Sequence, residues 1–306
     1  MTTGSRPAAR ARAAGLAPLV ALVLLALVLV GCSEAEEPRS PTGAADADAA
    51  GQEAAPDAPA TGASGGPGPP RPAPPAERAC YDLDLDEALA ATVDSPTRPC
   101  SSPHTARTFL VGRLDRAVDG HLLAVDSDRV RTQVASQCPA ALPDFVGGGG
   151  DGWRLSVLRA VWFTPTLSEA DAGASWFRCD VVAPDGRGGL LPLGGRLEGT
   201  LATPAGRDRW GLCATGAPDD RDARRVACAE QHSWRAVSVV ELAGTGPDGE
   251  DYPGEQAVQE RGQEPCEQVG RDRATDPLEF TWGYEWPSAE QWAAGQRFGR
   301  CWVPVA

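Results

Sequence analysis

The placement of eight of the nine cysteines, all except Cys32, constrains this chain more than any other feature. Cys100-Ser-Ser-Pro-His104 recurs as Cys228-Ala-Glu-Gln-His232, and in both cases another cysteine follows the histidine after 34 positions. Residues 165–179 and 287–301, which both end in cysteine, align without a gap and share Pro, Ala, Gly, Arg and Cys at five of fifteen positions. Self-similarity at this scale indicates repeated structural units. We interpret it as an internal duplication with four cysteines per copy.

The cysteines of the two copies predict a disulfide framework. An even number of cysteines in a secreted chain is typical of paired thiols, although eight of them allow 105 pairings. The duplication restricts these, because each copy should be closed on itself and both should be paired alike. We expect four bonds, which are Cys80–Cys100, Cys138–Cys179, Cys213–Cys228 and Cys266–Cys301. Each closes a loop that contributes about 3–4 kcal/mol of stability in the chain-entropy model.

The N-terminus has the pattern of an export signal. Three arginines precede the apolar run of residues 16–30, which is short for a membrane span and suits a signal-peptide core. The run ends in Leu29-Val30-Gly31-Cys32, which resembles the lipobox of bacterial lipoproteins, whose cysteine is diacylated. We therefore predict a signal peptide at 1–31 and a lipid-anchored protein on the extracytoplasmic face of the cell membrane. A plain signal peptide, or a short anchor with a chance cysteine, is the alternative.

Residues 32–79 predict a disordered tether. From Ser33 onward the segment consists mainly of Ala, Pro, Gly, Asp and Glu and has no bulky apolar residue. Such a segment cannot bury enough surface to offset the entropy lost on ordering. A coil of this length has a typical end-to-end distance of about 35–40 Å. It would hold a folded region away from the membrane.

The remaining residues predict an α+β fold of two tandem, disulfide-stabilised repeats, at 80–203 and 204–306. In each we expect a small antiparallel sheet with two short helices; one merged domain is the alternative. The strands are expected at 106–114, 153–163, 176–183, 197–202, 234–241, 278–286 and 297–303. Helices are expected at 128–138, at 166–172, and around Cys266 at 256–274. The first of these would be capped by Ser127 and ended by Pro139 and Pro143.

Composition excludes several functions. The formal charge is −14, and it becomes −17 without residues 1–31, because the remaining chain has 25 arginines and 42 acidic residues. Nucleic-acid and anionic-membrane surfaces need a basic patch, so we expect no nucleic-acid partner. The chain has no lysine, which removes the Walker A motif, Ser-x-x-Lys acyl transfer and Schiff-base chemistry.

The two repeated histidines, His104 and His232, have two interpretations. They are ligands or general bases, or each ring hydrogen-bonds backbone beside a disulfide; we favour the second. A catalytic histidine needs a nucleophile or an orienting acid within reach, and no motif supplies one. The repeated Cys-x3-His spacing also suggests zinc, but the tight cysteine pairs of structural zinc sites are absent. We expect no metal and no cofactor.

Tryptophan is enriched, with nine in the chain and four of them in the last 25 residues. Aromatic side chains of this kind form cores or contact surfaces for glycans and proteins. We favour the core, and we retain Trp286, Trp292 and the nearby Arg297 as possible binding residues.

These motifs resemble the septum formation domain of actinobacterial membrane and secreted envelope proteins. In the first copy the resemblance is carried by Cys100, Pro103, His104, Cys138, Trp162, Phe163, Pro165, Gly173 and Cys179. In the second it is carried by Cys228, His232, Cys266, Trp286, Pro287, Trp292, Gly295, Arg297 and Cys301. The first copy departs at Ala170 and Ser175, which align with Trp292 and Arg297. The resemblance implies a role near cell division or envelope assembly and offers no catalytic residues to carry over.

We therefore expect a non-enzymatic lipoprotein that binds another envelope component. One alternative is a cell-wall-modifying enzyme that uses carboxylates or the repeated His104 and His232. A second alternative is a metal-binding module.

Overall fold

A computed structural model describes residues 70–246 and 248–305, which all belong to one compact unit. The expected signal peptide at 1–31, the acylation site at Cys32 and most of the expected tether lie outside these residues. Within the described part of the chain, no helix combines the length and the apolar character needed to cross a bilayer.

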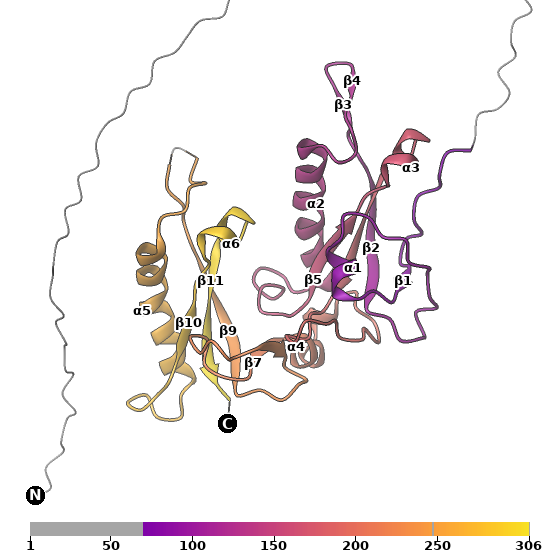
Figure 1. The fold of residues 1–306 in the computed structure, drawn as a ribbon. Helices are drawn as coiled ribbons and strands as arrows, with labels where there is room; N and C mark the ends of the chain where they lie inside the picture. Colours follow the sequence, from indigo (N-terminus) through magenta and orange to yellow (C-terminus); the bar gives the residue numbers. More distant parts are fainter. Residues whose placement is uncertain (1–69, 247, 306) are drawn as a thin grey trace, which may run out of the picture. The chain divides into compact units, whose positions relative to one another are not determined.

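Two antiparallel sheets, each with a long helix, make up the fold (Figure 1). The first part contains β1 (Cys80–Tyr81), α1 (Leu85–Leu89), β2 (Ala106–Arg113), β3 (Ala117–Val118), β4 (His121–Leu122), α2 (Asp128–Val146), β5 (Arg159–Phe163), α3 (Leu167–Asp171) and β6 (Trp176–Val182). After a 3-10 turn at Thr200–Ala202 come α4 (Pro204–Trp210), β7 (Leu212–Ala214), β8 (Arg225–Ala227), β9 (Trp234–Glu241), α5 (Glu255–Arg273), β10 (Gly283–Glu285), α6 (Ala289–Ala293) and β11 (Phe298–Pro304).

The two sheets have the same strand order. The first is β1-β2-β6-β5, and the second, read from its other edge, is β8-β7-β9-β11-β10. Apart from the extra edge strand β8, the strands β7, β9, β11 and β10 therefore follow the order of β1, β2, β6 and β5. In both sheets a helix of 19 residues leads to an edge strand. The helix α2 precedes β5 in the first sheet, and α5 precedes β10 in the second. Strands β3 and β4 form a separate hairpin.

A β-bulge lies at the same place in both sheets. Opposite β6, the register passes from Leu110↔Cys179 to Thr108↔Asp180 and leaves Phe109 as the extra residue. Opposite β11, it passes from Cys301↔Ser238 to Trp302↔Ala236 and leaves Val237 as the extra residue. A bulge increases the local twist and redirects a side chain. Both bulges stand opposite the cysteine of the last strand.

The helix α2 is longer than the sequence predicts. Ser127 occupies the N-cap position, but its side chain makes no capping hydrogen bond, and the helix continues past Cys138 to Val146 with Pro139 and Pro143 inside it. An interior proline costs about 3 kcal/mol of helix stability. Burial outweighs this cost here, because one side chain in every four is buried: Val130, Val134, Cys138, Leu142 and Val146. The helix expected at 256–274 is α5, displaced by one residue.

The short helices α3 and α6 begin and end alike. Thr166 and Ser288 are their N-caps, and each forms a reciprocal capping box with the residue three positions later. Gly173 and Gly295 follow them at φ 95° and 94°, a conformation that favours glycine. The helix α3 is the one that the sequence predicts at 166–172, and α6 lies at the equivalent place in the aligned stretch 287–301.

Three expected strands are shorter or absent. Residues 153–158 turn away from β5 so that their backbone pairs with residues 210–212, through Val157 N–H to Trp210 O at 2.8 Å and Leu212 N–H to Leu155 O at 2.7 Å. The expected strand at 197–202 is a 3-10 turn that Gly199 opens at φ 70°. Of 278–286, only Gly283–Glu285 is a strand, because Asp276 caps a turn at Leu278. Alternating apolar residues did not distinguish these turns from strands.

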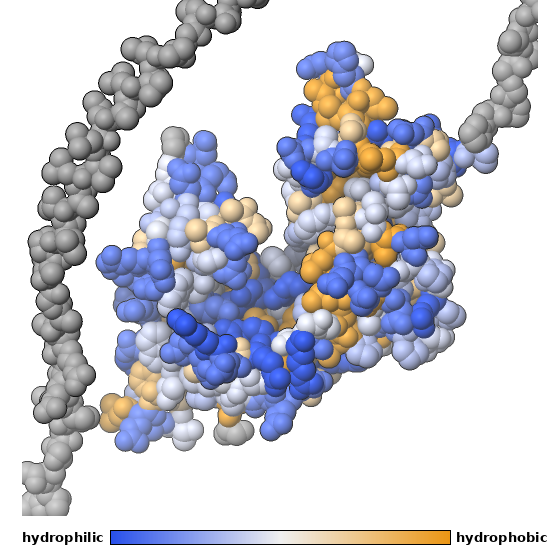
Figure 2. All heavy atoms as spheres, in the orientation of Figure 1, coloured by the Kyte–Doolittle hydropathy of each residue, from blue (hydrophilic) through white to orange (hydrophobic). Residues whose placement is uncertain are grey.

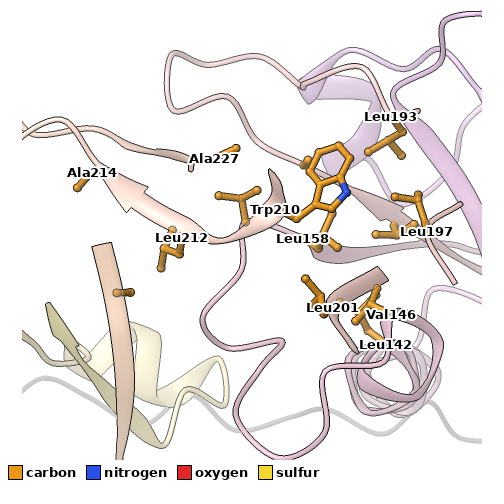
Figure 3. Close-up of a cluster of buried hydrophobic side chains, with 14 of the residues drawn as sticks. Leu142, Val146, Leu158, Leu193, Leu197, Leu201, Trp210, Leu212, Ala214 and Ala227 are labelled. Carbon is orange, nitrogen blue, oxygen red and sulfur yellow. The ribbon is translucent and has the colours of Figure 1, made fainter. Parts of the chain in front are cut away.

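One hydrophobic core joins residues from both expected repeats. It contains Leu142, Val146, Leu158, Leu193, Leu197, Leu201 and Trp210, and also Leu212, Ala214, Ala227, Ala236 and Trp302. Figure 3 shows the side chain of Trp210 among the leucines, with β7 leading away from it. The 3-10 turn and α4 both contribute to this core, and they flank the expected boundary at 203/204.

Four disulfides connect the eight cysteines of the described residues, and their pairing is the one predicted. Cys80 bonds Cys100, Cys138 bonds Cys179, Cys213 bonds Cys228, and Cys266 bonds Cys301. Two of these join a long helix to the last strand of its sheet, from α2 to β6 and from α5 to β11. These two bonds are buried in the helix-facing clusters.

Two glycines enclose the ring of Tyr284 on β10. A Cβ atom on Gly262 of α5 would lie 1.9 Å from its Cζ, and one on Gly299 of β11 would lie 2.4 Å from its Cε2. The Tyr284 hydroxyl donates to the Val258 carbonyl of α5 at 3.0 Å, and burial raises the pKa of Tyr284 to about 12. The two glycines therefore let the helix approach the sheet closely.

Gly262→Ala tests this contact, because helix propensity and packing predict opposite signs. Replacing an interior helical glycine by alanine normally stabilises by about 1 kcal/mol. Here we expect a loss of about 1–3 kcal/mol, the usual cost of overpacking. In a Tyr284→Ala background the ring is gone, and the same substitution should become stabilising. Denaturant unfolding of the four proteins measures both effects; stabilisation of the parent protein by Gly262→Ala would contradict the contact.

Candidate functional site

The two repeated histidines have the same backbone contact. His104 Nδ1 lies 2.8 Å from the Ser102 carbonyl oxygen, and His232 Nδ1 lies 2.7 Å from that of Glu230. His104 is buried, with 3% of its surface exposed, and its backbone pairs with Leu193. His232 is partly exposed. Each ring is thus held by a carbonyl two residues upstream.

His232 lies beside the Cys213–Cys228 disulfide. One ring nitrogen and the two Sγ atoms are within 4.8 Å of one another. The spacing suits a zinc site in principle, since histidine and thiolate are good zinc ligands. The two sulfurs are bonded to each other in this structure, so metal binding would require the reduced protein and a fourth ligand.

The sequence analysis kept Trp292 and Arg297 as possible binding residues. In the structure they hold the loop that contains Glu250 against α6. Trp292 is 2% exposed, and its Nε1 donates to the Glu250 carbonyl at 2.7 Å. The Arg297 guanidinium lies 4.3 Å from the Trp292 ring centre and 3.0 Å from the Glu250 carboxylate. Tyr252 packs edge-on against Trp292. Trp286 is partly buried beside Tyr284.

The first sheet contains a buried ion pair on the face that points away from α2. Arg178 Nη2 is 3.0 Å from Asp180 Oδ2, and Thr108 Oγ1 donates to Asp180 Oδ1 at 2.8 Å. The guanidinium lies between the rings of Tyr81 and Phe163, 3.9 and 4.5 Å from their centres. Burial raises the pKa of Asp180 to about 6, against the opposing effects of Arg178 and Thr108.

The second sheet has an arginine at the matching position, Arg300, which also precedes the cysteine of the last strand. Its Nη1 lies 3.3 Å from Glu285 Oε2, and its Nε donates to the Arg154 carbonyl at 2.9 Å. Arg225 donates to Glu285 Oε1 from Nε and Nη2, at 3.1 and 2.9 Å. Arg154 reaches Glu241 and stacks 4.5 Å from the ring centre of Phe298. This network connects the segment before β5 to the second sheet.

Arg159 adds a further charge near this network. Its Nη1 donates to the backbone carbonyls of Ser156 and Leu158, both at 2.8 Å. Burial, with the neighbouring charge of Arg300, lowers the pKa of Arg159 to about 10, and Glu285 opposes the shift. Burial also lowers the pKa of Arg300. We call Arg154, Arg159, Arg225 and Arg300, grouped near Glu285, the arginine cluster.

Sequence reasoning did not select the arginine cluster or the Arg178–Asp180 pair. The sequence did mark two of these arginines. Both aligned stretches end in Gly-x4-Arg-Cys, and the arginines of this motif are Arg178 and Arg300. The partners were not recognisable, because Glu285 and Arg154 come from distant segments.

Comparison with protein families gives a match over the second half of the chain. The family model described as "Septum formation" matches residues 150–301, which is just under half of the chain. The match includes Trp153 and Arg154, then β5, α3 and β6 of the first sheet, and the second sheet as far as Cys301 of β11. No curated protein and no solved structure matches the chain. The matched domain suggests a role linked to septum formation.

The buried Asp180 predicts a pH-dependent stability. Its pKa is higher in the folded protein, about 6, than the ordinary value of 3.8. The contribution of the protonated Asp180 side chain to the free energy of unfolding is therefore fully present below pH 3.8. This contribution is lost as the pH rises through 6. The loss is at most about 3 kcal/mol, since one pKa unit corresponds to about 1.4 kcal/mol.

The Asp180→Asn variant, which cannot titrate at this position, isolates this effect. We expect the unfolding free energy of the parent minus that of the variant to fall between pH 4 and pH 6.5, measured by urea unfolding at each pH. A difference that stays constant or rises over this range would show that the carboxyl is not desolvated.

Proposed function

We propose that this chain is a lipid-anchored, extracytoplasmic protein of the cell envelope that acts in septum formation by binding another envelope component. The observation that carries the proposal is the match of residues 150–301 to the septum formation domain. The four disulfides support an oxidising compartment, because structural disulfides persist outside the cytoplasm and are rare within it. The signal-like N-terminus and Cys32 are consistent with export and acylation.

We further infer that the two sheets arose by duplication. Shared strand order alone is weak support, because small antiparallel sheets have few topologies. Three independent details strengthen it: the bulge opposite the cysteine of the last strand, the disulfide from that cysteine to the long helix, and the capped turn before that strand. The copies interlock through a shared core.

The burial of His104 supports a binding role over catalysis, because a general base must reach the proton that it removes. In both histidines the Nδ1 atom contacts a backbone carbonyl, which fixes the orientation of the ring. The sequence offers no nucleophile motif to accompany either histidine.

The anchor is tested by Cys32→Ser. Two acyl chains give stable membrane attachment, whereas a chain without them is released. We expect the variant to lose palmitate incorporation and to leave the washed membrane fraction, while Ser33→Ala, the matched control, behaves as the parent. Palmitate labelling that persists in Cys32→Ser would contradict acylation at this residue.

The biological role is tested by depletion of the protein in its own organism. We expect misplaced or missing septa under the microscope, and restoration by the parent gene. His232→Ala should restore septation equally well, because the proposed role uses no catalytic base. Normal septation during depletion would refute the role, and failure of a stably folded His232→Ala would favour the enzymatic alternative.

A further inference from the structure

The two sheets differ at one equivalent corner, where the bulge residue meets the end of the long helix. In the first sheet, the bulge residue Phe109 stacks on Phe145 of α2, with ring centres 5.4 Å apart. Phe145 lies seven positions after the helix cysteine, Cys138. This aromatic pair packs against the shared hydrophobic core and fills the corner.

In the second sheet the same two positions are Val237 and Arg273. Val237 is the bulge residue, and Arg273 lies seven positions after Cys266 on α5. The Arg273 Nη2 atom lies 3.5 Å from the Val237 carbonyl oxygen. In place of an aromatic pair, the corner has a pocket of about 380 Å³, which we call the corner pocket. Its lining is Gly152, Leu155, Leu201, Arg207, Gly211, Arg235, Ala236, Val237 and Arg273.

Three guanidinium groups line the corner pocket, in a chain with an excess of acids. Arg207 donates to the backbone carbonyls of Leu201 and Ala202, so no carboxylate neutralises it in these contacts. Arg235 donates to the carboxylate of Asp208 at 3.2 Å, and that side chain is 70% exposed. No acidic residue is among the lining residues. Figure 2 shows hydrophilic residues on the surface over α4, which carries Arg207.

The lining also offers an apolar surface. Leu155, Leu201 and Ala236 contribute it, and Leu201 and Ala236 belong to the shared core. Small-molecule sites typically have volumes of about 300–1,000 Å³, with apolar walls and a few polar groups that set orientation. Guanidinium groups bind phosphate through paired, charge-assisted hydrogen bonds. Arg235 is paired with Asp208, whereas Arg207 and Arg273 form no ion pair within the described residues. The charges of these two arginines match a phosphate dianion better than a singly charged carboxylate.

We propose that the corner pocket binds a phosphate monoester whose organic part is apolar. The phosphate would lie among Arg207, Arg235 and Arg273, and the apolar part against Leu155, Leu201 and Ala236. The substitution of the Phe109–Phe145 pair by Val237 and Arg273 creates both the space and one of the charges. This proposal goes beyond the role in septum formation and does not depend on it.

Calorimetric titration of the purified, oxidised full-length chain tests the proposal. The probes are phenyl phosphate, benzoate and phenol. We expect saturable binding of phenyl phosphate, at least about tenfold weaker binding of benzoate, and none of phenol at the same concentrations. Higher salt should weaken binding of the phosphate, because the arginines are partly exposed. Absence of saturable binding, or equal binding of benzoate, would overturn the assignment to a phosphate.

Substitutions then locate the site. Arg273→Gln and Arg207→Gln should each weaken phenyl phosphate binding about tenfold or more, since each removes a charge-assisted contact. Arg261→Gln, on the same helix but outside the corner pocket, is the matched control and should bind as the parent. Unchanged binding in both Arg273→Gln and Arg207→Gln would place the ligand elsewhere and overturn the proposal.

A variant that fills the corner pocket gives an independent test. Val237→Phe combined with Arg273→Phe places in the second sheet the aromatic pair that fills the first. We expect this variant to lose phenyl phosphate binding while its thermal unfolding stays cooperative. Parent-like binding by the folded variant would overturn the proposal. If the variant does not fold, the two glutamine substitutions still decide it.

Discussion

The bond between a long helix and the last strand of its sheet is the constraint on which each half of this structure depends. Cys138–Cys179 and Cys266–Cys301 are buried where helix and sheet face each other. They hold helices with weak local preference, since α2 contains two prolines and α5 contains one proline and two glycines. In water such helices would be marginal without packing. The disulfide and the apolar side chains beside it supply that packing.

The opposite faces of the two sheets are covered in different ways. The first sheet covers its face with its own N-terminal segment, in which Tyr81, Leu83 and Ala88 pack on Phe163 and Val182. The second sheet receives the segment before β5, through the contact of Trp153 with Phe298 and that of Arg154 with Arg300. The second half is therefore incomplete without residues that precede it.

The same arginine position is used for two purposes. Arg178 pairs with Asp180 inside one sheet, whereas Arg300 connects the second sheet to a distant segment through Glu285 and the Arg154 carbonyl. A buried guanidinium needs hydrogen-bond partners wherever it lies. In the second half those partners come from both parts of the chain, and the aromatic corner of the first half is replaced by a pocket. If the two halves share an origin, these are the places where their surfaces have diverged.

Several features were readable from the sequence because they depend on local chemistry or on the repetition itself. These are the cysteine pairing, the strands β2, β6, β9 and β11, and the short helix α3. Local rules were wrong where tertiary packing outweighed them. The prolines did not end α2, because its buried face continues to Val146. The strand expected from Trp153 became a turn, because its backbone pairs with residues 210–212.

The candidate sites were even less accessible to sequence reasoning. His104, His232 and Trp292 were visible as repeated or unusual residues, yet the structure engages them with nearby backbone carbonyls. The arginine cluster and the corner pocket draw on residues separated by up to about 150 positions, whose proximity no spacing rule reveals. The sequence by itself determined the disulfide pairing and the central strands, because the number of cysteines, their repeated spacing and the alternation of apolar residues can be read directly from the order of residues. Only the tertiary structure decided which charges meet and where a pocket remains, because both follow from packing between distant segments.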